Sequence, residues 1–506
     1  MSLMKRILAS LLMVFLAPTA LRAQTAELAD RPNIIVIMAD DHGQWAMGAY
    51  GLKYIQTPNL DWLAETGVLF KNAMSVAPVC SPARASFYTG KMPSQHGVHD
   101  FLGEGKEFDA NWLSGEKLLS EWLQDSGYRT ALLGKWHATI DSAIVQRGFD
   151  RWLSYDVSRT GWQNQYQHQG TVYFSDDGKP MAQTGVQARF LTEQAIQFID
   201  RPDKRPFYIS LNFVEPHFPF AGLPERLVSK YRPIAQKVVR AGDSSDLPVR
   251  LSGNLVPADH EEQLAQYLAA VSLIDDQVGR LMDALQGRDA LKNTIVIYVS
   301  DHGLLVGQYG LYGKTNASAP ANFYEETIRI PLIFNGPARF MRPRQTRHEM
   351  VSLIDLHTTI RDFASGGKQA RSDYGPGRSL TPLLQGKRQT NWRRYNYAER
   401  GNLRMVTNGH WKLVRQYPQN QRAIPTDTWY DLASPMRERH STVPPRPALR
   451  DRLIGALDQF FKKYETPEHS GRRIWDQPYP NARVKSEMQQ DKKKAASETS
   501  DKEITK

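Results

Sequence analysis

Cysteine is almost absent from this chain, whose 506 residues contain only Cys80. A single thiol has no partner within the chain, so a disulfide framework is excluded. A chain of this length can bury a large apolar core without covalent cross-links. A lone cysteine is either a buried, inert side chain or a reactive thiol, and its neighbours decide which.

Long apolar runs are also scarce. The run "ILASLLMVFLA" follows Lys5 and Arg6 and precedes small residues near Ala23. It is shorter than the roughly 20 residues of a membrane-spanning helix, and this three-part layout is typical of a secretory signal. We therefore expect a signal peptide over residues 1–23, cleavage near Ala23, and a periplasmic or secreted protein without stable membrane insertion. An uncleaved N-terminal anchor is the alternative.

Concentrated basic runs with interleaved aromatic residues are missing, although the formal net charge is +11. Without such a run or a known nucleic-acid-binding fold, we expect no nucleic-acid partner. A basic surface suits an anionic substrate, which it attracts at long range. Solubility explains the same charge equally well.

The stretch around the cysteine, "PVCSPARASFYTG", predicts a short helix. Ser81 fits an N-cap, Pro82 the first helical position and Gly90 the end. The free NH groups and the positive dipole at a helix N-terminus favour an anion near Cys80. Arg84, about one turn further on, adds a fixed positive charge. The stretch is therefore suited to a tetrahedral oxyanion.

Polar residues follow five apolar, β-rich runs, as expected for a parallel sheet with a site at its carboxyl edge. The weakest run, "LFKNAMSVAPV", leads to Cys80. The other four, "NIIVIMADD", "TIVIYVSDHG", "TALLGKWH" and "PFYISLNFVEPH", deliver Asp40, Asp41, Asp301, His302, Lys135, His137 and His217. Helical patterns alternate with these runs, so we expect an α/β domain with helices on both faces of the sheet.

Three aspartates gathered at strand ends repel one another unless a cation lies between them. Oxygen ligands favour a hard ion, and Ca²⁺ tolerates irregular geometry better than Mg²⁺. An imidazole ligand makes the choice of metal less clear. We expect Ca²⁺, with Mg²⁺ second, at a site that includes Asp40, Asp41, Asp301 and His302.

The segment "CSPARASFYTG" resembles the signature of the sulfatase family, in which Cys-x-Pro-x-Arg is followed at fixed spacing by Thr-Gly. Further segments resemble sulfatases in the usual order, namely "TPNLDWLAETGVLFKNAM", "LLGKWH", "RGFDRW", "YLAAVSLIDDQVGRLMDAL" and "VIYVSDHGLLVGQYGLYGKTN". They spread over most of residues 33–337. One departure is "ATIDSAI" after "GKWH", where the family often has a Leu-Gly turn.

This resemblance implies the alkaline-phosphatase-like fold: a mixed, mostly parallel sheet covered by helices on both faces, with a smaller C-terminal α+β domain. It also implies that Cys80 is oxidised to Cα-formylglycine by a formylglycine-generating or radical-type sulfatase-maturation enzyme. A hydrated aldehyde has two hydroxyls, of which one attacks sulfur and the other, once deprotonated, expels sulfate.

The resemblance also assigns roles to other residues. Lys135 and Lys314 bind sulfate, and Lys314 can face the leaving oxygen. His137 takes a proton from the formylglycine hydroxyl, while His217 binds sulfate or protonates the departing alcohol. Arg84 completes this catalytic set. The resemblance also adds Cys80 to the predicted metal ligands Asp40, Asp41, Asp301 and His302. General acid or base action typically contributes about 10² to 10⁴-fold in rate.

The sequence changes character after about residue 391. The segments "LRMVTNGHWKLVRQY" and "DTWYDLASP" predict short strands with a hairpin, and "PALRDRLIGALDQFFKKYE" predicts a helix. We expect a catalytic domain over 31–390, a C-terminal subdomain over 391–484, and a disordered charged tail over 485–506.

An insert of polar and aromatic residues, "SYDVSRTGWQNQYQHQGTVYFSDDGKP", fits no simple strand or helix. Loops at the carboxyl edge of such sheets commonly shape substrate pockets. Trp162, Tyr166 and Tyr173 can stack on sugar faces, or equally pack the insert itself. On this ground we expect a sulfated glycan as substrate rather than a small aryl sulfate.

The sequence thus predicts an exported sulfatase. Two alternatives stay open: a phosphonate monoester or phosphodiester hydrolase of the same fold, and a calcium-dependent glycan-binding protein that has lost catalysis. The histidines and two lysines favour sulfate over the first alternative. The second would not require the whole catalytic set, which consists of Cys80, Arg84, Lys135, His137, His217 and Lys314.

Overall fold

The computed structural model describes residues 31–483, with gaps at 104–110, 162–167, 240–249, 252–256, 367–374, 421, 435–436 and 479–480. The expected signal peptide, the charged tail, Trp162 and Tyr166 lie outside the described residues. Within the described ranges, no helix is both long and apolar enough to cross a membrane.

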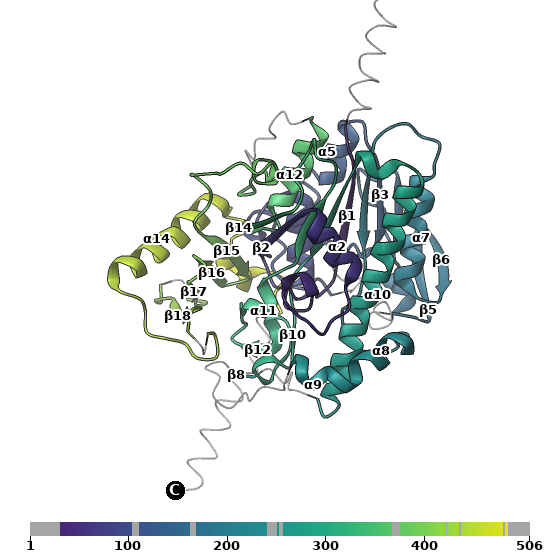
Figure 1. Cartoon of the computed structure of the whole chain (residues 1–506). Coiled ribbons are helices and arrows are strands. Elements are labelled where there is room, and N and C mark those ends of the chain that lie inside the picture. The colour runs from purple at the N-terminus through teal and green to yellow at the C-terminus, as the bar shows by residue number, and fades with distance from the viewer. Residues whose placement is uncertain are drawn as a thin grey trace, which may run out of the picture.

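A ten-stranded mixed sheet forms the centre of the molecule (Figure 1). In order across the sheet, the strands are β14 (Gln345–Ser352), β2 (Val68–Met74), β13 (Leu332–Asn335), β9 (Thr294–Ser300), β1 (Asn33–Ala39), β7 (Phe207–Asn212), β3 (Arg129–Gly134), β4 (Arg151–Tyr155), β5 (Thr171–Asp176) and β6 (Lys179–Thr184). Strands β9, β1, β7, β3 and β4 are parallel, as are β14 and β2. Antiparallel pairs join β13, β5 and β6 to their neighbours. All five apolar runs predicted as strands therefore lie in one mixed, mostly parallel sheet.

Both faces of this sheet are buried, because successive side chains of a strand point to opposite sides. On β1, Ile34 and Val36 pack into one core and Ile35 and Ile37 into the other. The Ile35 side is covered by α2 (Pro58–Thr66), α7 (Gln187–Ile199), α8 (Glu225–Tyr231) and α10 (His260–Gly287), and the Ile34 side by α3 (Cys80–Thr89), α5 (Leu119–Asp125) and α12 (Asp355–Ala364). The expected α/β architecture with helices on both faces is confirmed.

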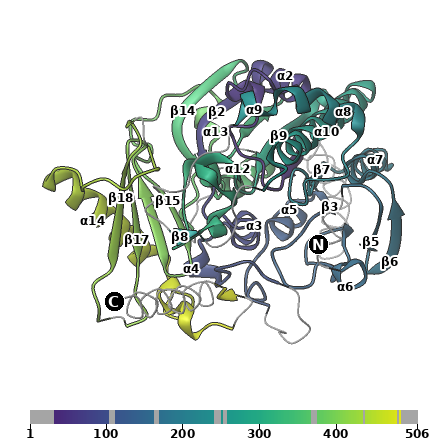
Figure 2. The ribbon, with the colours of Figure 1, turned by 90° about the horizontal axis from the view of Figure 1, so that it is seen from below.

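A smaller antiparallel sheet follows in the chain. It consists of β15 (Asn396–Arg400), β16 (Leu403–Thr407), β17 (Trp411–Gln416) and β18 (Thr426–Asp431). Leu453, Leu457 and Phe461 of α14 (Pro447–Tyr464) share a core with Leu413 and Trp429 of this sheet. Figures 1 and 2 both place the sheet and α14 to one side of the main sheet. The predicted C-terminal hairpin and helix are therefore present, while the exact domain boundaries stay a prediction.

The remaining described elements are short. They are α4 (Pro93–His96), α6 (Val157–Thr160), α9 (Ala235–Val238), α11 (Glu325–Ile328), α13 (Thr381–Leu384), the ladders β8 (Arg250–Leu251) with β12 (Ser318–Ala319) and β10 (Leu305–Val306) with β11 (Tyr312–Gly313), and 3₁₀ turns at Gly48–Tyr50, Arg232–Ile234, Ala290–Asn293, Gln308–Gly310, Thr315–Ala317 and Gly471–Asp476.

Two local expectations were wrong. Helix α3 begins at Cys80 with Val79 as its N-cap, because the Ser81 hydroxyl instead accepts a hydrogen bond from the Leu102 NH at 3.0 Å. The insert contains the β5–β6 hairpin, whose turn residues Asp177 and Gly178 have φ of 50° and 86°. An Asp-Gly pair between strands is a recognised hairpin signal, so the sequence did carry this information.

Candidate active site

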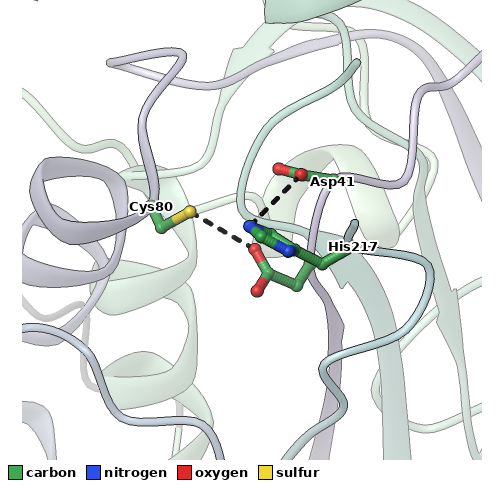
Figure 3. A group of neighbouring side chains, drawn as sticks. Asp41, Cys80 and His217 are labelled. Atoms are coloured by element: carbon green, nitrogen blue, oxygen red, sulfur yellow. Dashed lines mark hydrogen bonds and ion pairs between the residues drawn. The ribbon is translucent and has the colours of Figure 1, made fainter. Parts of the chain in front are cut away.

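Every residue predicted for the site lies at the carboxyl edge of the main sheet or on a segment packed beside it. Asp40 and Asp41 follow β1, Asp301 and His302 follow β9, Lys135 and His137 follow β3, His217 follows β7, Lys314 follows β11, and Cys80 and Arg84 lie in α3 after β2. All are buried except Lys314, which is partly exposed. Figure 3 shows Cys80 at the start of its helix, across the site from Asp41 and His217.

The sulfur of Cys80 is the point at which these segments meet. Its Sγ atom lies 3.4 Å from Asp40 Oδ1, 3.3 Å from His302 Nε2 and 2.9 Å from Lys314 Nζ. Groups from three separate segments thus surround one side-chain atom. This geometry is what a nucleophile requires, because the attacking atom must be held among groups that control its charge.

Fixed cations face the three aspartates. Arg84 Nε donates to Asp301 Oδ2 at 2.8 Å, Lys314 Nζ donates to Asp41 Oδ1 at 2.8 Å, and Lys135 pairs with Asp40. Arg84 Nη1 also donates to the Lys135 carbonyl oxygen at 2.8 Å, which links α3 to the end of β3. Buried ions of both signs are therefore held in a connected network, as burial of charge requires.

This network stabilises negative charge at position 80. Burial alone would raise the pKa of the Cys80 thiol, but Lys135, Lys314 and His302 lower it well below its usual value. Burial and the charge at Cys80 would likewise raise the pKa of Asp40, yet Lys135 and other cations lower it to about 2. The site therefore favours anions at neutral pH.

His137 is held in a form that can accept a proton. Its Nε2 lies 3.1 Å from the Leu102 carbonyl oxygen, which only accepts, so Nε2 carries the hydrogen and Nδ1 is the nitrogen left for Cys80. The Phe101 ring packs edge-on against the imidazole with centroids 4.8 Å apart. Burial lowers the pKa of His137 to about 4, so the ring is neutral at pH 7.

Sequence patterns did not indicate Phe101 and Leu102, which orient His137. The reason is that Phe101 acts through a ring contact and Leu102 through a backbone carbonyl, and neither residue follows a strand. Leu102 also donates its NH to Ser81, so the same short segment fixes the start of α3 and the ring of His137.

His217 and Lys314 line a cavity of about 420 Å³ beside the cysteine. His217 Nε2 lies 3.6 Å from Asp41 Oδ2, and its other ring nitrogen bonds the Phe218 carbonyl oxygen. That second contact places the hydrogen on Nδ1, because a carbonyl only accepts. Aromatic side chains, including Phe218, Phe220 and Tyr312, form much of the wall. The cavity thus offers an apolar surface next to the buried ionic groups.

Two overlapping groups of side chains fit a metal ion, since their donor atoms lie within 4.8 Å of one another. One consists of Asp40, Cys80, Asp301 and His302, and the other of Asp40, Asp41, Cys80 and His217. Carboxylate oxygens with one imidazole suit a hard divalent cation. The second group includes His217, which was predicted as a catalytic residue and not as a metal ligand.

Comparison with known proteins identifies the family. A profile described as Sulfatase matches residues 32–366, and a second, described as N-sulphoglucosamine sulphohydrolase, C-terminal, matches residues 307–443. An N-acetylglucosamine-6-O-sulfatase of Bacteroides thetaiotaomicron is 29% identical over 447 residues, which cover 73% of this chain and 74% of the relative.

Two solved structures show the same fold. A structure in complex with its substrate D-glucosamine-2-N,6-O-disulfate superposes with a TM-score of 0.71 at 25% identity, covering 86% of this chain and 98% of the other. A phosphonate monoester hydrolase of Agrobacterium radiobacter superposes with a TM-score of 0.68 at 21% identity, covering 86% and 96%, and shares the fold alone. Because the sulfatase profile spans most of the chain, including every predicted site residue, the protein belongs to the sulfatase family and is a sulfuric ester hydrolase.

Proposed function

We propose that the protein is exported and hydrolyses sulfate esters of a sulfated glycan, using a formylglycine made from Cys80 together with a divalent cation. The observation that carries this proposal is the convergence of Asp40, His302 and Lys314 on the Sγ atom. Binding of a glycan would not require three groups around one buried side-chain atom. The geometry therefore supports an enzyme over an inactive glycan-binding protein.

The names of the relatives support the proposed substrate class. The Bacteroides relative is an N-acetylglucosamine-6-O-sulfatase, and the superposed structure holds a disulfated glucosamine. The C-terminal match to N-sulphoglucosamine sulphohydrolase concerns the same kind of sugar. We therefore propose a sulfated hexosamine within a glycan as the group from which sulfate is removed.

The hydrate of formylglycine would carry two hydroxyls on one carbon, and in this structure the Cys80 sulfur stands in for them. His137, neutral because burial lowers the pKa of its imidazole, is placed to take a proton from one of these hydroxyls. His217 lines the cavity, and when its ring is doubly protonated, Nε2 is placed to donate a proton to the departing sugar oxygen. Positioned proton transfer of this kind typically accelerates a reaction by about 10² to 10⁴-fold.

Positive groups surround the position of the sulfate. We propose that Lys135, Lys314 and Arg84 hold the sulfate oxygens, since all three already stabilise negative charge at position 80 or on the adjacent aspartates. Asp40, Asp41, Asp301 and His302, with residue 80, would hold Ca²⁺, with Mg²⁺ as the second choice. When bound, the cation supplies further positive charge to the sulfate oxygens.

The test combines chemical and kinetic measurements on protein purified from its native host. Mass spectrometry of the peptide that contains Cys80 should show the mass loss expected when CH₂SH becomes CHO, and elemental analysis should show a bound divalent cation. Turnover should be seen with 6-O-sulfated N-acetylglucosamine and be faster than with a matched phosphonate monoester. An intact thiol in all molecules would contradict the proposed nucleophile, and faster turnover of the phosphonate would contradict the proposed substrate class.

A further inference from the structure

A second cavity, of about 430 Å³, lies where the main domain meets the C-terminal sheet and α14. Its lining comes from the end of β14, the segment that leads into β15, and the C-terminal half of α14. It shares no lining residue with the cavity beside Lys314. Its volume is within the range of about 300 to 1,000 Å³ that is typical of ligand sites.

The wall of this cavity carries an excess of positive charge. Arg378, Arg393 and Arg394 all line it, and the guanidinium carbons of the first two lie 5.8 and 5.9 Å from the centroid of the Trp392 ring. Arg393 pairs with the buried carboxylate of Asp355. Burial and the charge of Arg393 lower the pKa of Arg378, and Asp355, which also pairs with Arg393, offsets only part of this lowering. A bound anion would add negative charge beside both guanidinium groups.

Aromatic rings form the rest of the wall. Tyr395, Tyr397, Phe460 and Tyr464 line the cavity, and Tyr397 stacks on Phe460 with centroids 3.8 Å apart. The Trp392 ring is fixed by a hydrogen bond from Nε1 to the Met350 carbonyl oxygen at 2.8 Å. Planar rings offer flat apolar faces to a sugar, and guanidinium groups bind sulfate or carboxylate through paired hydrogen bonds. Together they match an anionic saccharide.

The cavity and Cys80 lie at the same edge of the main sheet. Ser352, which lines the cavity, ends β14 and pairs with Met74, the last residue of the parallel strand β2. Val76 also lines the cavity and lies four residues before Cys80. Four extended residues span at most about 14 Å, so one wall of the cavity lies within about that distance of Cys80.

From these observations we propose that the cavity between β14, β15 and α14 is a second binding site, outside the catalytic centre, for an anionic stretch of the glycan. Its function would be to hold the polymer while a sulfated residue occupies the site at Cys80. The proposal rests on the proposed function for the identity of the polymer. Binding at the cavity can nevertheless be measured without turnover.

The first test measures binding by isothermal titration calorimetry, in a Cys80→Ala background, with a heparin octasaccharide as probe. The exposed side chains of Arg378 and Arg394 are reversed together in Arg378→Glu/Arg394→Glu, and we expect affinity to fall by at least about tenfold, because charge-assisted hydrogen bonds are lost. The matched control Arg189→Glu/Arg226→Glu reverses two exposed arginines on α7 and α8 and should change affinity by less than about twofold, since distant charges are screened.

A third variant, Tyr395→Ala, leaves every charge in place and should weaken binding by about threefold or more if sugar faces stack in the cavity. If Arg378→Glu/Arg394→Glu and Arg189→Glu/Arg226→Glu lose affinity equally, non-specific attraction explains the binding and the proposal is overturned. Unchanged affinity in Arg378→Glu/Arg394→Glu would overturn it as well.

The second test separates this proposal from the proposed function. In the Cys80 enzyme, Arg378→Glu/Arg394→Glu should keep kcat/KM on a sulfated monosaccharide and lose about tenfold on the octasaccharide, mainly through KM. An equal loss on both substrates would overturn the proposal. Absence of turnover by the parent enzyme on every sulfated saccharide would contradict the proposed function, while the calorimetry would still report on the cavity.

Discussion

Two clusters of buried charged side chains in this protein contain similar residue types. They differ in whether they contain an atom that can react with a substrate. One surrounds Cys80. The other, the Lys412 cluster, consists of Lys412, Glu325 and Glu438, and joins α11 to β17. Both contain carboxylates and a lysine that are withdrawn from water, and both contain carboxyl groups whose pKa is strongly displaced.

The Lys412 cluster is complete without any ligand. Its ammonium group has three hydrogens, and Nζ lies 2.7 Å from the Phe323 carbonyl oxygen, 2.7 Å from Glu325 Oε1 and 2.6 Å from Glu438 Oε1. Glu438 Oε2 also accepts from the Glu325 NH at 2.6 Å. Burial would raise the pKa of Glu325, but Lys412 and Arg329 lower it to about 2. Burial raises the pKa of Glu438 to about 7.

Both clusters border a cavity, because Glu325 also lines one of about 370 Å³. The cluster around Cys80 differs because its cavity lies beside a nucleophilic atom. Asp41, His217 and Lys314 line that cavity, so a substrate can reach charged groups that are otherwise buried. Burial of charge by itself therefore does not identify a functional site. The distinguishing feature is a reactive atom on which several charged groups converge.

The largest effect should follow from removing that atom. In Cys80→Ala, we expect kcat/KM on a sulfated monosaccharide to fall by at least about 10⁴-fold, because loss of a covalent nucleophile removes the reaction path rather than one interaction. Stability should change little, since the cations at Asp40, Asp41 and Asp301 keep their partners. Steady-state kinetics and a thermal melt test both statements, and retained turnover would contradict the proposed role of Cys80.

The contrast between the clusters also shows how much of the site can be predicted from the sequence. The placement of Asp40, Asp301 and Lys135 at one edge could be predicted, because parallel strands end at the same edge of a sheet and each residue follows an apolar run. The pairing of each cation with its carboxylate could not be predicted, because the order of the strands in the sheet brings Lys135 and Asp40 together. The catalytic roles of these residues stay predictions that the experiments above test.

Predictions from local sequence patterns were wrong where a contact with a residue distant in the sequence determines the structure. Ser81 has the sequence of an N-cap, but its hydroxyl bonds Leu102, which lies on a different segment. No sequence pattern indicated the Lys412 cluster, because its three members lie on separate segments and none follows a buried parallel strand. The Asp177-Gly178 turn is a different case. Its Asp-Gly pair does indicate a hairpin, but the polar residues around it make the flanking strands hard to recognise.

The second largest effect should be on stability. Lys412→Met keeps the length of the side chain but leaves Glu438 buried without its cation, and breaking a buried ion pair in this way typically costs about 3 to 5 kcal/mol. We expect a clear fall in the midpoints of thermal and urea unfolding. Specific activity of the folded enzyme should stay within about twofold of the parent, because the cluster does not line the catalytic cavity.

The double variant Lys412→Met/Glu438→Gln serves as the control for this prediction. An amide at position 438 carries no charge, so part of the lost stability should return if the uncompensated carboxylate is the cause. If the double variant is no more stable than Lys412→Met, lost packing would be the cause instead. If Lys412→Met is inactive while still folded, the distinction drawn between the two clusters would be wrong.

The smallest effect should come from an ion pair on the surface. Arg288 Nη2 donates to Asp200 Oδ2 at 2.6 Å, but the two side chains remain 36% and 48% exposed. Water and salt screen such pairs, so Asp200→Asn should change the free energy of unfolding by less than about 1 kcal/mol. Arg288 lowers the pKa of Asp200, so this small contribution is present above the usual pKa of an aspartate and is lost as the pH falls through the lowered value. Urea unfolding of parent and variant at neutral pH, with and without added salt, measures the difference, and a loss as large as that of Lys412→Met would show that exposure does not separate these pairs.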